Sequence, residues 1–121
     1  MENLKSLQKK IKRFVSERDW EKFHSLKNLS MSFSIEAAEL MEHFQWVDTD
    51  DCNPKDLEEN QYEQIKEEIA DVMIYSLMFS SEMGIDPLSA IEEKIEKNEE
   101  KYPVQKAKGS TKKYTEFKEE Q

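Results

Sequence analysis

Apolar residues recur at intervals of three or four along most of the chain, with charged and polar residues between them. Residues at this spacing lie on one face of an α-helix. The pattern predicts four helices: residues 2–18, from a cap at Asn28 or Ser30 to about Gln45, from about Leu57 to Met83, and from Asp86-Pro87 to about Lys101. Two glycines and three prolines supply little of the turn chemistry that strands need. The predicted fold class is therefore all-α, with four helices arranged like a four-helix bundle.

The third predicted helix is apolar nearly all round in its second half, from Val72 to Phe79. A helix of this kind in a soluble protein must be covered on every side. A chain of 121 residues has few helices with which to cover it. We therefore expect an oligomer whose interface uses the third helix.

Composition and charge narrow the classes of function. A length of 121 residues is typical of one domain, which we expect over residues 1–103, followed by a basic, flexible tail over 104–121. The formal charge of −9 and the lack of a basic, aromatic-rich patch before the tail argue against binding to nucleic acid. No apolar run has membrane-spanning length, no signal peptide is evident, and the single Cys52 fits a reducing compartment. These features predict a soluble, cytoplasmic protein.

Two pairs of carboxylates lie within apolar, helix-forming stretches: Glu36 with Glu39, and Glu68 with Asp71. Each pair is three residues apart, so its members lie side by side on one helix face. If the two helices face each other, four carboxylates converge, and their repulsion and desolvation are costly. A hard divalent cation with oxygen ligands, such as Mg²⁺, resolves both problems. Such a site can bridge the phosphates of a nucleotide and hydrolyse a phosphoanhydride, although the spacing does not indicate which phosphorus is attacked.

Aromatic and basic residues elsewhere in the chain can complete a nucleotide site. Trp20 lies in a polar connector and either caps the core or stacks on a nucleobase, and Trp46 is a second candidate for stacking. Lys94 shares one face of the fourth helix with Asn98 and Tyr102. A lysine on a helix is usually solvated, so the alternative for Lys94 is contact with a phosphate or base.

Two other classes of protein use similar parts. Di-iron bundle proteins need two Glu-x-x-His pairs. In this chain His43 follows Glu39 by four residues, and the Glu68-x-x-Asp71 pair has no histidine partner, so we reject a redox centre. A non-enzymatic helical interaction module would explain the amphipathic helices and the oligomer. It does not explain the carboxylate pairs within apolar runs, and it stays as the alternative function.

The motifs resemble the MazG-like all-α nucleoside triphosphate pyrophosphohydrolases, and more narrowly their dCTP pyrophosphatase branch. The matching stretches span most of residues 4–103: Glu17 to His24, Asn28-Leu29, Glu36 to Leu40, Phe44-Gln45-Trp46, Glu67 to Tyr75, and Lys94 through Asn98 to Tyr102-Pro103. The carboxylate pattern alone is moderately specific, and the other stretches make the resemblance strong.

The resemblance implies a MazG-type fold and cleavage between the α and β phosphates of a nucleoside triphosphate, with dCTP or a modified dCTP as first choice. The products would be a monophosphate and pyrophosphate, and the role would be cleansing of the nucleotide pool. The implied cofactor is Mg²⁺, for which Mn²⁺ can substitute. The implied assembly is a homotetramer of this chain, built as a dimer of dimers. The implied metal ligands and catalytic residues are Glu36, Glu39, Glu68 and Asp71. The implied substrate-binding residues are Trp20, His24, Asn28, Trp46, Tyr75, Lys94, Asn98 and Tyr102.

One position departs from the pattern of many family members, which carry a doubled glutamate at the start of the first pair. Here that position is Ile35. The branch of the family that resembles dCTP pyrophosphatases also tends to lack this glutamate, so the departure does not argue against activity. It does leave the number of bound metal ions undetermined.

Overall fold

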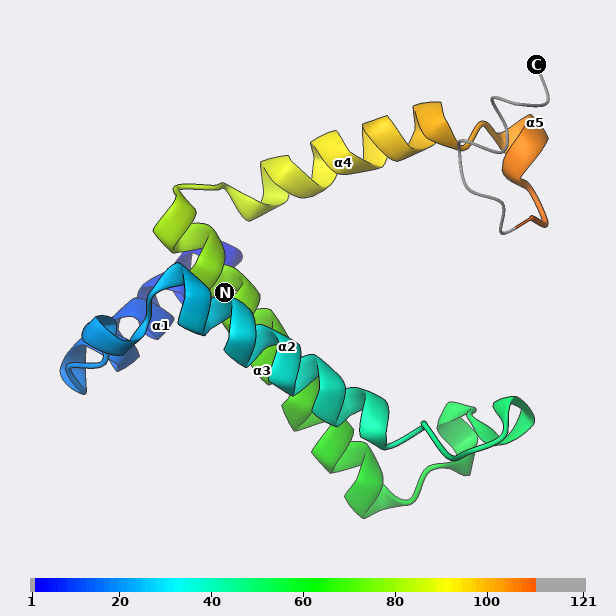
Figure 1. Cartoon of the computed structure of the whole chain (residues 1–121), viewed down its shortest axis with the longest axis horizontal. Coiled ribbons are helices and arrows are strands. Elements are labelled where there is room, and N and C mark those ends of the chain that lie inside the picture. Colours follow the sequence, from blue (N-terminus) through cyan, green and yellow to red (C-terminus); the bar gives the residue numbers. More distant parts are fainter. Residues whose placement is uncertain (1, 111–121) are drawn as a thin grey trace. The chain divides into compact units, whose positions relative to one another are not determined.

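The computed structural model describes residues 2–110 of the chain (Figure 1). The helices are α1 (Leu4–Glu17), α2 (Leu26–Glu42), α3 (Glu59–Met83), α4 (Pro87–Lys101) and α5 (Val104–Ala107), with short 3₁₀ turns at Glu21–Phe23, Thr49–Asp51 and Pro54–Asp56. Residues 2–110 contain no strand. The predicted all-α fold class is therefore confirmed, and no helix in these residues is both long and apolar enough to cross a membrane.

The chain divides into two compact units, Met1–Gly84 with α1 to α3, and Ile85–Gln121 with α4 and α5. In the first unit, α2 and α3 pack side by side in opposite directions, and α1 packs against α3 (Figure 1). In the second unit, α5 follows α4 directly within the stretch predicted to be a flexible tail. Residues 111–121 of that predicted tail lie outside the described residues.

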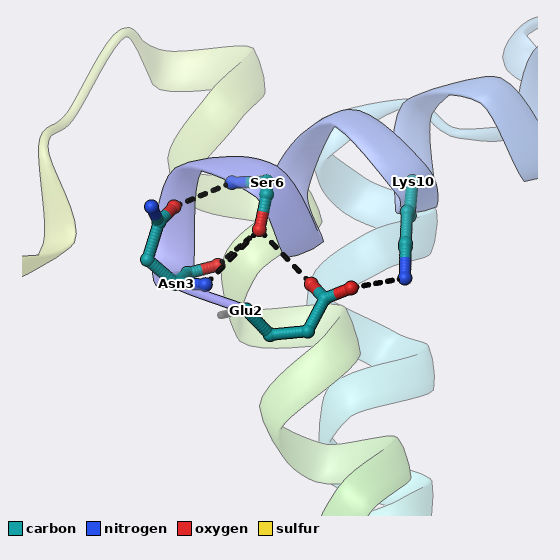
Figure 2. A network of polar contacts seen from close by, with 4 residues as sticks. All are labelled: Glu2, Asn3, Ser6 and Lys10. Atoms are coloured by element: carbon teal, nitrogen blue, oxygen red, sulfur yellow. Dashed lines mark hydrogen bonds and ion pairs between the residues drawn. The ribbon is translucent and has the colours of Figure 1, made fainter.

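Local capping chemistry sets where the helices begin. At the start of α1, the Asn3 side chain accepts a hydrogen bond from the Ser6 N–H (2.9 Å) and the Ser6 hydroxyl accepts one from the Asn3 N–H (3.0 Å), as Figure 2 shows. The Ser6 hydroxyl also donates to Glu2, and Lys10 pairs with the same carboxylate. These contacts, that of Lys10 first, lower the pKa of Glu2. The first helix is thus joined to its preceding residues by a closed polar network.

The second helix differs in its limits from the sequence prediction. Ser25 is the N-cap, accepting a hydrogen bond from the Asn28 N–H at 3.1 Å, so the helix begins before Asn28 and not at it. It ends at Glu42, three residues before Gln45, because the chain forms a series of turns after His43. Ser25 and Asn28 are both residue types that cap helices, and spacing alone does not choose between them.

The third helix begins at Glu59, two residues after the predicted Leu57. Leu57 is extended because the preceding segment closes on itself: Asn53 and Asp56 cap the turn that Pro54 begins. The helix ends at Met83, and its C-cap residue Gly84 has a φ of 68°. Glycine adopts this left-handed conformation at little cost, so the predicted stop is confirmed. Asp86 and Pro87 also begin α4 as predicted, with the Asp86 carboxylate accepting from the Leu88 N–H.

The hydrophobic core of the described chain is small. Leu29, with 1% of its surface exposed, and Val15 are its buried apolar residues. On α3, Leu77 and Met78 are half-buried, whereas Met73 and Ile74, about one turn earlier, are exposed. The packing of α1 and α2 therefore leaves part of the apolar half of α3 uncovered.

Leu29→Ala should lower the free energy of unfolding by about 2–5 kcal/mol, because it removes the most buried side chain and leaves a cavity. Urea or thermal unfolding followed by circular dichroism would measure the loss. Leu26→Ala is the matched control on the same helix, since Leu26 is 42% exposed, and it should cost less than about 1 kcal/mol. Equal losses in the two variants would contradict this description of the core.

Candidate functional site

The packing of α2 against α3 brings the two predicted carboxylate pairs within electrostatic reach of each other. The pKa of Glu36 is raised, first by burial and then by the charges of Glu39 and Asp71, with smaller contributions from a hydrogen bond with Glu39 and from the charge of Glu68. Repulsion of this kind acts between carboxylates that are close in space. Glu36 and Glu68 are half-buried, whereas Glu39 and Asp71 are exposed. The other three acids are thus close enough to Glu36 to raise its pKa, and we refer to the four as the carboxylate cluster.

A histidine that sequence reasoning did not assign to the site also belongs to this cluster. The Nε2 atom of His43 lies 2.6 Å from Oε2 of Glu68, and both side chains are half-buried. His43 is the C-cap residue of α2. It follows Glu36 by seven residues and Glu39 by four, and this spacing places it on the same helix face. The spacing was visible in the sequence, but His43 was weighed there only as a partner for a di-iron motif.

The chemistry of the cluster suits a hard divalent cation. Its donors are carboxylate oxygens, which Mg²⁺ prefers, and the repulsion that raises the pKa of Glu36 would be relieved by a positive charge. Oε2 of Glu68 is buried and accepts no well-aligned hydrogen bond in the described part of the chain. No three His, Cys, Asp or Glu side chains among residues 2–110 already surround a common point. Ion binding would thus require rotation of side chains, for which the exposed Glu39 and Asp71 have room.

A cavity of about 410 Å³ lies in the same unit. Its lining has an apolar part, which includes Val15, Leu29, Leu77 and Met78. The charged and polar residues of the lining include three lysines of α1, namely Lys5, Lys9 and Lys12, together with Glu21 and His24. The volume falls in the range of small-molecule sites. Of the predicted substrate-binding residues, His24 lines this cavity.

The cavity and the carboxylate cluster are arranged along the same pair of helices. Leu29 precedes Glu36 by seven residues on α2, and Met78 follows Asp71 by seven residues on the antiparallel α3. Seven residues of helix rise about 10 Å. The cavity therefore lies about two helical turns from the carboxylates.

The other predicted residues of the Met1–Gly84 unit have varied surroundings. Trp20 packs edge-on against Phe14, with ring centroids 5.7 Å apart. The Asn28 side-chain amide donates to the Phe23 carbonyl at 3.0 Å, which gives this residue a local structural contact. Tyr75 is half-buried on α3, one turn after Asp71. Trp46 is 89% exposed in the turns after α2.

The remaining three predicted residues lie in the second unit. Lys94 and Asn98 are one turn apart on α4, and Tyr102 is its C-cap residue. They share one face at the spacing that the sequence indicated. Their role in a nucleotide pocket stays a prediction.

Comparison with known proteins gives consistent results. A profile of the MazG-like family matches residues 31–117. The dCTP pyrophosphatase 1 proteins of Rattus norvegicus and Homo sapiens are each 35% identical over 104 residues, which are 86% of this chain and 61% of the relative. The chain thus spans about three fifths of the length of these relatives. The crystal structure of a pyrophosphatase from Archaeoglobus fulgidus is 42% identical and superposes with a TM-score of 0.78, covering 85% of this chain and 94% of that one.

Glu36→Gln should stabilise the metal-free protein at pH 7. A raised pKa means that the folded state holds the proton of Glu36 more tightly than the unfolded state, so the ionised form destabilises the fold. This penalty is absent below the ordinary pKa of 4.5 and complete above the raised pKa. The melting temperature of the variant should exceed that of the wild type by on the order of 1–5 °C at pH 7 and match it near pH 4.

Glu42→Gln is the control for this experiment, because Glu42 is an exposed glutamate on the same helix. It should leave the melting temperature unchanged at both pH values. A gain from Glu36→Gln that is as large at pH 4 as at pH 7 would show that charge is not its cause.

Proposed function

The chain belongs to the MazG-like family, as its motifs predicted, and we propose that it is a nucleoside triphosphate pyrophosphatase. The observation that carries this proposal is the cluster of Glu36, Glu39, Glu68 and Asp71 on two packed helices. The proposed substrate is dCTP or a modified dCTP, and the products are the monophosphate and pyrophosphate. The names of the relatives support this choice: two are dCTP pyrophosphatases and the third is a pyrophosphatase. The proposed role is cleansing of the nucleotide pool in the cytoplasm.

The four carboxylates would hold Mg²⁺, for which Mn²⁺ could substitute. The bound ion would neutralise charge on the phosphates and lower the pKa of the attacking water. Water adds to the α-phosphorus, the bond from that phosphorus to the bridging oxygen breaks, and pyrophosphate leaves. A carboxylate of the cluster that is not used as a ligand can accept the proton of the water.

The cavity is the proposed site for the nucleoside. Its apolar residues suit a base and sugar. The lining has three lysines against two glutamates, Glu21 and Glu82, and this small positive balance favours an anionic ligand in an otherwise acidic protein. The separation of about two helical turns lets the phosphates reach the carboxylates. We propose that His24 contacts the nucleoside in this cavity. Further contacts are proposed for Trp20, Asn28, Trp46, Tyr75, Lys94, Asn98 and Tyr102.

The proposed assembly is a homo-oligomer, built as a dimer of dimers. Its support is the exposed apolar surface of the helices that also carry the carboxylates. The exposed residues include Met31 and Met41 on α2 and Ile69 and Met73 on α3. Exposed large apolar side chains on neighbouring helices favour association with another chain.

The first test of the proposed activity is product analysis. Purified protein with Mg²⁺ and a panel of canonical and modified nucleoside triphosphates should release monophosphate and pyrophosphate, fastest from a cytosine deoxynucleotide, as measured by chromatography and a separate pyrophosphate assay. Glu39→Gln and Asp71→Asn should each lose nearly all turnover and bind Mg²⁺ weakly in calorimetry, because each removes one charged ligand.

Diphosphate with orthophosphate as products would overturn the proposed bond, and full activity in either variant would overturn the ligand assignment. Absence of any product from protein that binds Mg²⁺ and is oligomeric would favour a helical interaction module instead.

The proposed assembly is tested by light scattering coupled to size-exclusion chromatography. The expected mass is four times the chain mass of 14.4 kDa. Met73→Glu, which puts a charge on the exposed side of α3, should shift the protein to smaller species. A monomeric wild type at micromolar concentration would contradict the proposal.

A further inference from the structure

The contact between His43 and Glu68 is unlike the other ion pairs of its unit. It joins α2 to α3 across 25 positions of sequence. In the described part of Met1–Gly84, the other ion pairs join residues at most eight positions apart and lie on exposed side chains. The relative side-chain exposure of His43 is 15% and that of Glu68 is 22%. Exposed pairs contribute little, whereas a contact shielded from water restrains both partners.

One oxygen of the Glu68 carboxylate faces His43. Oε2 is buried and has no well-aligned hydrogen-bond donor among the described residues, and the His43 ring nitrogen lies beside it. A buried carboxylate oxygen that stays unpaired is costly. A small rotation of the imidazole would direct its Nε2–H group at this oxygen and satisfy it.

The Nε2 atom of His43 lies 2.6 Å from Oε2 of Glu68, within the distance of a direct contact. Mg²⁺ prefers oxygen ligands to the nitrogen of imidazole. These observations favour a role for His43 beside the ligand set and not within it.

We propose that His43 is a positioning residue, whose Nε2–H group holds Oε2 of Glu68 and leaves Oε1 to bind the divalent cation. This inference rests on the proposed function, because it takes Glu68 to be a metal ligand. Ligating side chains are commonly oriented by such outer contacts, and the loss of one typically weakens metal binding 10- to 100-fold. His43 is well placed for this task, since it follows Glu36 and Glu39 on the same face of α2.

The test compares two substitutions that differ in hydrogen-bonding capacity. His43→Phe keeps a ring of similar size without a donor, and His43→Gln supplies a side-chain N–H in place of Nε2–H. Mn²⁺ affinity, measured by electron paramagnetic resonance of the free ion and by calorimetry, should fall about 10- to 100-fold in His43→Phe. It should return to within a few-fold of the wild type in His43→Gln. Glu42→Gln, at the adjacent exposed position, should change the affinity less than about threefold.

A second comparison separates positioning from direct coordination. In a Glu68→Gln background, His43→Phe should cause no further loss of Mn²⁺ affinity, because the partner it orients is already altered. A further tenfold loss in that background would make His43 a ligand in its own right and overturn the proposal. If His43→Phe does not fold, as judged by circular dichroism, His43→Ala replaces it with the same expected result.

Failure of this inference and failure of the proposed function have different signatures. Wild-type affinity in the folded His43→Phe variant, or no Mn²⁺ binding by the wild type, would overturn the positioning role. A wild type that binds Mn²⁺ but cleaves no nucleoside triphosphate would overturn the proposed function alone, and the metal titrations would still decide the role of His43. With an active wild type, His43→Phe should need 10- to 100-fold more Mg²⁺ for half-maximal rate, and saturating Mg²⁺ should restore most of kcat.

Discussion

Repulsion among four carboxylates on two packed helices is the constraint on which the first unit depends. The contact of α2 with α3 brings the two acidic pairs together, and burial and neighbouring charge then raise the pKa of Glu36. Without a positive charge, the packing of apolar side chains must outweigh this repulsion. Leu29 and Val15 are the buried apolar residues in the described chain, so the stabilisation that apolar packing provides within a single chain is small. A cation would change the balance in favour of the folded state, because it binds the assembled cluster and not the unfolded chain.

The same two helices also expose large apolar side chains, and this links the acidic site to assembly. Ile35 lies directly before Glu36, and Ile69 directly after Glu68, and both are exposed. A partner that covered these residues would remove water from the neighbourhood of the carboxylates. Charges interact more strongly in a site from which water is excluded. Assembly would therefore increase the repulsion among the carboxylates and also the gain from binding a cation.

The described polar contacts explain how the site can be ordered without a large core. Most of them are local: caps at Asn3, Ser25 and Asp86 set the helix ends. His43 and Glu68 form the exception, because their contact crosses from α2 to α3. It lies at the end of α2, where the chain leaves the helix and where the packing would otherwise be least constrained. A contact at this place limits both the separation of the helices and the rotation of the Glu68 side chain.

The sequence by itself determined the all-helical class, the acidic pairs on single helix faces, the stop at Gly84 and the start at Asp86. These features depend on spacing and capping within a few residues, which the sequence shows directly. The start of α2 was wrong because Ser25 and Asn28 are both acceptable caps, and local chemistry does not choose between them. Only the tertiary structure decided that His43 meets Glu68 and that residues of α1, α2 and α3 line one cavity. Both depend on how two helices are aligned along their length, and helical periodicity gives the face of each helix but not the register between them.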